Sequence, residues 1–356
     1  MTATPPQVDN VLALPRALLV LLGASAAVVT MAGVHEARGI LGPLFLALVL
    51  TIVVHPVRER LQRRVPGWCA SVLCILLVSG IIIGLAVAVV LAVARFGSLL
   101  PAYADDLADL VDDATAWLHR LGIDADQVQH VRSGLDLGGL ADLVESALTG
   151  VFGAASSLVF ILALCLFMAV DGRTFPAQLG TVGERRPELV GALSEFAVGT
   201  RRYLWVSTVF GLIVALLDTM ALYVLDVPVP LLWGLLAFLT NYIPNVGFVI
   251  GLIPPAILAL LDSGPGLMLA VVAIYAVLNL VIQSGIQPKV VGDAVGLSTT
   301  LTFVSLVFWS WIIGPVGAVL AVPLTLLARA LLVDADPGNR WLVPLIANRE
   351  VSPPES

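Results

Sequence analysis

Charged residues are scarce in this chain, and lysine is nearly absent. Only 12% of the 356 residues are charged, while 59% are hydrophobic and the mean hydropathy is +1.01. A soluble domain carries about 25% charged residues, so the composition excludes an ordinary water-soluble globule. The chain has a single lysine, Lys289, and no basic patch that would suit a nucleic acid. We therefore expect a polytopic membrane protein without a nucleic-acid partner.

Motifs for metal, disulfide or nucleotide chemistry are missing too. Cys69, Cys74 and Cys165 lie in apolar stretches, with no CxxC pair and no histidine at metal-ligand spacing. This pattern predicts buried thiols, no metal site and no disulfide framework. No GxxxxGK[ST], HExxH or GxSxG motif occurs. We expect no cofactor, and no ATP hydrolysis by this chain.

Two aspartates near apolar runs leave one enzyme class to consider. Intramembrane aspartyl proteases need two facing carboxylates, for which Asp218 and Asp293 are the candidates. Asp293 follows Val291-Gly292 rather than a Gly-x-Gly sequence, and we expect it at the membrane interface. The sequence therefore favours a protein that is not an enzyme.

The apolar runs predict an all-α transmembrane bundle of about eight spans. Two runs, 231–262 and 299–332, exceed a straight crossing by about ten residues and contain central glycines and prolines, so we expect broken helices or hairpins there. The first run is long enough to span and has no convincing signal cleavage site. The runs cover residues 11–34, 40–56, 68–96, 150–170, 203–225, 231–262, 267–287 and 299–332.

These runs divide the chain into four parts. Residues 1–97 hold the first three spans, 98–148 form an extracytoplasmic insertion, 149–332 form the transmembrane core, and 333–356 form a cytoplasmic tail. The insertion has ten acidic residues against two arginines, and its apolar residues recur every three or four positions. This spacing predicts an amphipathic helix. Its acidic face either covers the bundle as part of a helical hairpin or forms a vestibule that gathers cations.

Arginine placement predicts the orientation. The loops after the second and fourth runs are rich in arginine, so both should be cytoplasmic, together with the N- and C-termini. An apolar stripe over Pro187–Arg202 predicts a separate interfacial helix on the inner leaflet. The loop arginines are Arg58, Arg60, Arg63, Arg64, Arg173, Arg185, Arg186, Arg201 and Arg202.

A polar ridge follows the seventh span. Tyr275, Asn279, Gln283 and Gln287 recur at four-residue intervals, which places them on one side of a helix between apolar neighbours. Polar groups in a bilayer are costly, so the ridge is a candidate lining of a substrate path. The alternative is that these side chains hold neighbouring helices together by hydrogen bonds.

The two long runs have similar interruptions. Each contains a proline, then Val-Gly, an apolar stretch and a second proline. Paired interruptions of this kind point to a transporter's binding site. Chance similarity of short Gly- and Val-rich stretches is the alternative. The candidate hinge residues are Pro244, Gly247, Gly251 and Pro254 in the first run, and Gly314, Pro315, Gly317 and Pro323 in the second.

Three ionisable residues are candidates for a gate or for ion coupling. Asp218 lies in the fifth span, where an unpaired carboxylate is strongly disfavoured, so it is a candidate proton or cation site. It is also near the loop at Asp226, and a hydrated acid of the outer leaflet would explain it equally. Lys289 and Asp293 stand four residues apart, suited to an ion pair at a gate, or Lys289 is a cytoplasmic anchor.

Several motifs in the last third of the chain resemble the autoinducer-2 exporter family. They are the stretches at 241–247 (NYIPNVG), 287–292 (QPKVVG), 314–317 (GPVG) and 321–324 (AVPL). The resemblance implies about eight spans in the bacterial inner membrane, homo-oligomers with a pentamer as one form, and export of a small furanone-type signalling molecule. It adds Asn241 and Asn245 to the candidate substrate path. The chain departs from the family pattern at Asn245 and Phe248, where an aromatic residue and a proline are common.

These observations favour an inner-membrane secondary transporter that exports a small polar organic solute, such as an autoinducer-2-like signalling molecule. A sodium or proton antiporter is the first alternative, since Asp218 could carry the coupling ion. An oligomeric membrane scaffold without transport is the second. The expected partners are the lipid bilayer, the solute, a coupling proton or sodium ion, and further copies of the chain.

Overall fold

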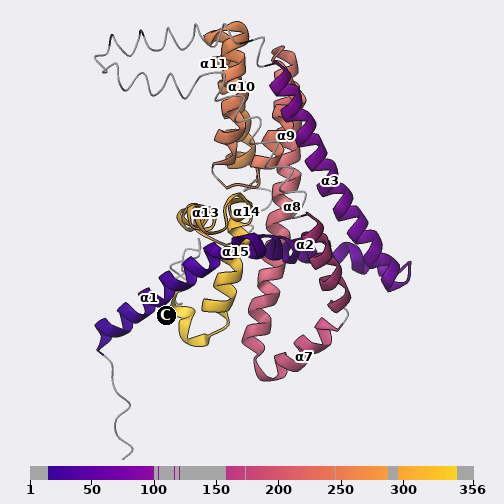
Figure 1. The fold of residues 1–356 in the computed structure, drawn as a ribbon, viewed down its shortest axis with the longest axis vertical. Coiled ribbons are helices and arrows are strands. Elements are labelled where there is room, and N and C mark those ends of the chain that lie inside the picture. Colours follow the sequence, from indigo (N-terminus) through magenta and orange to yellow (C-terminus); the bar gives the residue numbers. More distant parts are fainter. Residues whose placement is uncertain are drawn as a thin grey trace, which may run out of the picture.

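The computed structural model describes residues 15–99, 103, 116, 120, 158–172, 174–244, 246–287 and 296–342. Within these ranges every regular element is a helix, as the sequence predicts (Figure 1). Most of the insertion expected at 98–148 and the chain from residue 343 onward lie outside the described residues. The fourfold division of the chain remains a prediction.

The first predicted spans correspond to long helices. They are α1 (Arg16–Glu36), α2 (Arg38–Gln62) and α3 (Gly67–Leu99), followed by a helix at Leu158–Asp171 and by α7 (Phe175–Arg185). Among the described residues, four helices are long and apolar enough to cross a membrane: α2, α3 and the helices at Pro187–Val224 and Pro265–Gln283. A fifth is added if the bent pair ending in α7 is one span. The other predicted runs contain shorter apolar helices, because glycine and proline interrupt them.

Helix α8 (Pro187–Val224) is the longest element described. Its 38 residues extend about 57 Å, well beyond the thickness of a bilayer core. The prediction of a separate interfacial helix over Pro187–Arg202 is wrong, because that stretch is the first part of α8. Its apolar stripe packs on protein rather than on lipid: Ala192 and Phe196 contact Val322 and Leu326.

The run at 231–262 folds back on itself as a hairpin. It forms α9 (Pro230–Thr240) and α10 (Gly247–Ser263), which pack against each other. A Cβ placed on Gly247 would collide with the Thr240 carbonyl, and one on Gly251 would lie 3.4 Å from Ala237 Cα. Gly247 at the start of α10 lies against Thr240 at the end of α9, and the later Gly251 lies against the earlier Ala237. The two helices are therefore antiparallel. We call this pair the first hairpin.

The run at 299–332 also folds back. It forms α13 (Thr299–Ile313), α14 (Pro315–Val319) and α15 (Ala321–Arg329), with Gly314 at a φ of 80° that favours glycine. The Trp309 Nε1–H donates to Thr325 Oγ1 at 3.0 Å, across the fold. A Cβ on Gly317 would collide with the Trp309 carbonyl, as at Gly247. We call this unit the second hairpin; it continues into the π-helix η3 (Ala330–Asp334).

The two hairpins pack on opposite halves of α8. Leu222, near the end of α8, belongs to one core cluster with Trp233 and Ala256 of the first hairpin. Phe196, near its start, clusters with Val322 of the second. In Figure 1, α10 and α11 (Pro265–Asn279) lie beside the upper part of α8, whereas α15 lies beside its lower part. The turn of each hairpin therefore lies within the bundle, near the middle of α8.

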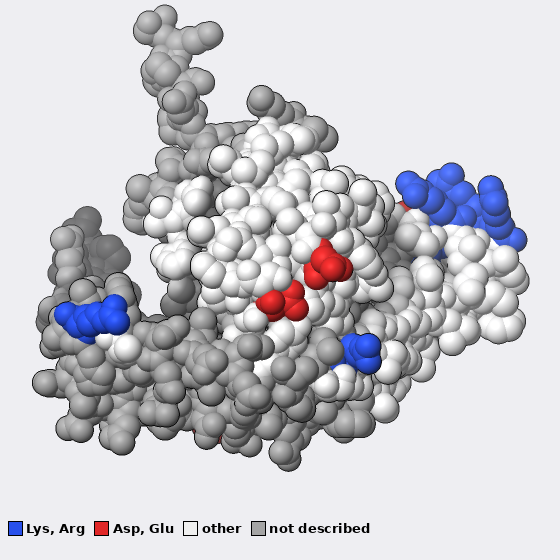
Figure 2. Space-filling model, turned by 90° about the horizontal axis from the view of Figure 1, so that it is seen from above, with Lys and Arg blue, Asp and Glu red and all other residues white. Residues whose placement is uncertain are grey.

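The surface of the described residues is largely apolar. Large hydrophobic side chains are exposed along the spans, among them Leu76 and Leu91 on α3 and Trp205 and Leu216 on α8. Seen from above, charged side chains form a few separate groups on a mostly uncharged face (Figure 2). Apolar exposure on this scale is suited to lipid rather than to water, so the helices contact a bilayer.

The glycine contacts of the hairpins predict a loss of stability on substitution. Gly247→Ala and Gly317→Ala should each lower the free energy of unfolding by about 1–3 kcal/mol, because the new methyl group collides with a carbonyl of the preceding helix. Thermal unfolding of the purified protein in detergent measures this. Gly80→Ala is the matched control, since a Cβ there meets no atom within 4 Å. Equal melting temperatures for all four proteins would contradict the packing described.

Candidate functional site

Polar side chains from three parts of the chain line one cavity beside the first hairpin. Helices α8, α9, α10 and α11 form its walls, together with the π-helix η2 (Leu280–Ile286) that follows α11. Among the residues predicted for the site, Asp218, Asn241, Gly251, Tyr275, Asn279 and Gln283 all line this cavity. The structure thus brings together candidates that are up to 65 positions apart, from Asp218 to Gln283.

An amide network fixes one wall of this cavity. The Gln283 Nε2–H donates to Asn279 Oδ1 at 2.7 Å and to Asn241 Oδ1 at 3.1 Å. Asn241 Nδ2 donates to the Ser207 carbonyl at 2.8 Å, and Asn279 Nδ2 to the Tyr275 carbonyl at 2.8 Å. The network therefore joins α8, the turn of the first hairpin and α11.

The polar ridge of the seventh span is not one regular α-helix. Helix α11 ends at Asn279, and η2 continues as a π-helix with Gln283 at its centre. Single π turns within helices are often found at functional sites. Gln287 follows η2 and does not line the cavity, so the structure separates it from the other three ridge residues.

Asp218 lies inside the protein rather than at a hydrated surface. Its side chain is 1% exposed, and neither carboxylate oxygen has a hydrogen-bond partner among the described residues. The Tyr275 hydroxyl, on the same cavity, also has no partner there. Burying such groups without partners costs several kcal/mol, so they are the atoms that most need a ligand or water.

The cavity is small in this conformation. Its volume is about 10 Å³. That volume is of the order needed for one water molecule. The site as described can hold a water or a monatomic ion, and an organic solute needs it to open.

Sequence reasoning missed Thr240 and Ser207. Thr240 ends α9 on the cavity wall, and Ser207 supplies a main-chain carbonyl to Asn241. Both are single small hydroxyl residues among apolar neighbours. They are not part of a polar pattern that repeats at helical spacing, so the sequence does not mark them. Their proximity to the site depends on the hairpin turn, which the sequence leaves undetermined.

The remaining predicted residues lie elsewhere or are not described. Pro244 lies in the turn of the first hairpin and Pro254 inside α10, while Gly314, Pro315 and Gly317 form the turn of the second hairpin. Pro323 is buried in α15. Asn245, Lys289 and Asp293 lie outside the described residues.

The described residues offer no cluster that could hold a metal ion. No group of three or more histidine, cysteine, aspartate or glutamate side chains occurs in that part of the chain. Its three cysteines are free.

Interrupted helices around a buried polar site define a class of membrane protein. Secondary transporters typically bind their substrates where discontinuous helices meet near the midplane. Comparison with protein families identifies a transporter family: residues 24–335 match the model described as AI-2E family transporter. The chain belongs to this family, and it is a multi-pass membrane transporter.

Individual relatives support the same assignment. The chain is 33% identical to the AI-2 transport protein TqsA of Escherichia coli strain K12, an alignment that covers 89% of this chain and 92% of the relative. It is 30% identical to a Haemophilus influenzae protein with a provisional transport-protein name, over 93% of this chain and 96% of that one. The similarity therefore extends over nearly the whole length of both relatives.

The amide network predicts which ridge residue matters for stability. Gln283→Leu should lower the free energy of unfolding by about 1–3 kcal/mol, because the Asn241 and Asn279 side-chain oxygens lose their donor. Gln287→Leu makes the same chemical change outside the cavity and should have a smaller effect. Thermal unfolding in detergent compares the two variants. A larger loss for Gln287→Leu would show that the network has been assigned to the wrong residues.

Proposed function

We propose that this protein is a secondary transporter that exports a small polar organic solute, of the autoinducer-2 type, in exchange for protons or sodium ions. The observation that carries the proposal is the cavity at the first hairpin. It combines an amide network with a buried carboxylate that has no hydrogen-bond partner among the described residues. The relative TqsA is named as an AI-2 transport protein, which supports this class of solute.

The amide groups suit a solute with several hydroxyl or carbonyl oxygens. Asn241, Asn279 and Gln283 provide both donors and acceptors in a space from which most water is excluded. In our proposal a polyol or furanone exchanges its hydrogen bonds to water for bonds to these amides. Asn245, which lies outside the described residues, stays a predicted member of the path.

The first hairpin provides the moving part. The cavity is too small for an organic solute, so α9 and α10 must separate where Gly247 and Gly251 now hold them in contact. Glycine allows this close approach. Pro244 and Pro254 have no backbone N–H to donate, so the carbonyls that such a group would otherwise bond lack this partner and the chain bends more easily there. The second hairpin has the same kind of contact at Gly317, and we assign the complementary movement to this hairpin, which packs on the other half of α8.

Asp218 is the proposed coupling residue. A carboxylate with no partner in apolar surroundings is stabilised by taking up a proton or a small cation, and the cavity has room for one. This observation also favours the alternative, an antiporter that exchanges sodium for protons without an organic solute. Lys289 and Asp293 remain predicted gate residues. A scaffold without transport would leave the cavity without a role.

The proposal includes an orientation and an assembly. We propose that both termini lie on the cytoplasmic side of the inner membrane, which the arginine-rich loops favour. The first hairpin would then enter from the opposite side. Exposed apolar faces on several helices leave room for further copies, and we propose a homo-oligomer, with the pentamer as the form to test first.

Transport in proteoliposomes tests the function. Wild-type protein should move autoinducer-2 against its gradient when a proton or sodium gradient is imposed. Asp218→Asn should lower this gradient-driven flux by about tenfold or more, because the carboxylate can no longer exchange an ion. Asp226→Asn is the control, since Asp226 is exposed just beyond the end of α8.

The outcomes separate the candidates. Sodium–proton exchange without movement of autoinducer-2 would favour the antiporter. Autoinducer-2 flux that is independent of any gradient and unchanged in Asp218→Asn would remove the coupling role from Asp218. No flux of solute, sodium or protons by folded wild-type protein would contradict transport through this site.

A further inference from the structure

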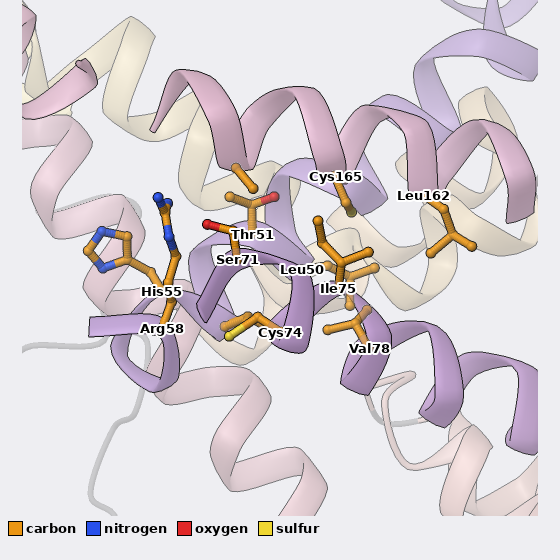
Figure 3. A pocket seen from close by; sticks show the side chains of 12 residues that line it. Leu50, Thr51, His55, Arg58, Ser71, Cys74, Ile75, Val78, Leu162 and Cys165 are labelled. Carbon is orange, nitrogen blue, oxygen red and sulfur yellow. The ribbon is translucent and has the colours of Figure 1, made fainter. Parts of the chain in front are cut away.

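A second cavity lies between α2, α3 and the helix Leu158–Asp171, away from the hairpin site. It is a partly open cavity with a volume of about 40 Å³. Figure 3 shows that its two ends differ in chemistry: Arg58 and His55 lie together at one end, and Leu162 and Val78 lie at the other. The cavity is therefore mainly apolar, with Arg58 at one end.

Arg58 differs from the other arginines of its loop. Its side chain is only 8% exposed, whereas Arg60, Arg63 and Arg64 are exposed. Its Nε has no hydrogen-bond partner among the described residues, and no carboxylate in those residues forms an ion pair with it. The neighbouring Glu59 instead lies 3.7 Å from His55 Nδ1. The guanidinium is thus a buried positive charge without a counterion in the described part of the chain.

Arg58 lies against the end of the helix Leu158–Asp171. A Cβ on Gly172 would lie 3.1 Å from Arg58 Nη1, so the missing side chain lets the guanidinium reach the end of the helix Leu158–Asp171. The nearby hydroxyls of Thr51 and Ser71 donate to carbonyls of their own helices, to Ala47 at 2.8 Å and Gly67 at 3.0 Å. Arg58 is therefore the strong donor that faces this end of the cavity.

A buried guanidinium needs an anionic partner with suitable geometry. Phosphate and carboxylate oxygens accept paired hydrogen bonds from arginine, and a buried charge without such a partner is costly. The aliphatic part of the cavity, formed by Leu50, Ile75, Val78 and Leu162, excludes a purely ionic ligand from most of the space. The two requirements together describe an anionic amphiphile.

We propose that this cavity binds an anionic phospholipid from the surrounding membrane. Its phosphodiester accepts hydrogen bonds from the Arg58 guanidinium, and part of one acyl chain lies along the aliphatic side chains. The polar end adjoins the arginine-rich loops, and basic pockets between membrane helices on the cytoplasmic side are suited to such headgroups. The bound lipid would hold the helix Leu158–Asp171 against α2 and α3.

Thermal unfolding of the full-length protein in neutral detergent tests this site. Titration with phosphatidylglycerol should raise the melting temperature in a saturable way, and phosphatidylcholine should raise it much less. Arg58→Gln should weaken the apparent affinity for phosphatidylglycerol by about tenfold to a hundredfold, as expected for loss of charged hydrogen bonds. Arg63→Gln removes the same charge from an exposed position of the same loop and should leave the affinity unchanged.

A second variant covers the case in which Arg58→Gln does not fold. Val78→Phe fills the aliphatic end while keeping the arginine, and it should also reduce the response to phosphatidylglycerol. Soluble glycerol 3-phosphate separates the two sources of phosphate, because it lacks the acyl chain. The proposal would be overturned if glycerol 3-phosphate raised the melting temperature as much as phosphatidylglycerol does. It would also be overturned if phosphatidylglycerol and phosphatidylcholine raised the melting temperature equally, or if Arg58→Gln and Val78→Phe both left phosphatidylglycerol binding unchanged.

Discussion

The need to satisfy backbone groups inside a membrane governs this structure. Two turns interrupt the helices near the middle of α8, where lipid offers no hydrogen bonds. Protein groups replace water at the first turn: the Tyr203 hydroxyl donates to the Tyr242 carbonyl at 3.0 Å, and Asn241 Nδ2 donates to the Ser207 carbonyl at 2.8 Å. Helix α8 therefore supports the break as well as the two hairpins that pack on it.

The same constraint accounts for the polar cavity. A turn inside the bundle brings Asn241 next to α11, and Gln283 completes the network from the π-helix that follows. Asp218 and Tyr275 line the space left beside this network, and their polar atoms have no partners in the described residues. The amides that stabilise the broken helix are thus also the groups that we propose bind a solute.

Much of this arrangement could be predicted from the sequence, and the rest depends on contacts between distant segments. Hydropathy located the helices, and the spacing of Tyr275, Asn279 and Gln283 identified one wall of the cavity. The continuity of α8 was missed, because its amphipathic first part is as compatible with a membrane surface as with protein. Burial of Arg58 could not be distinguished from the exposure of Arg63, since both belong to one arginine-rich loop and only packing of a later helix separates them.

The central claim is that solute passes through the cavity when α9 and α10 separate. A Cβ on Gly251 would lie 3.8 Å from Ala237 Cβ, a separation typical of disulfides, and both residues line the cavity. The direct measurement is autoinducer-2 flux by the double variant Ala237→Cys, Gly251→Cys, in a background without the three native cysteines. The account predicts that oxidation stops flux and reduction restores it. Undiminished flux through fully cross-linked protein would contradict it.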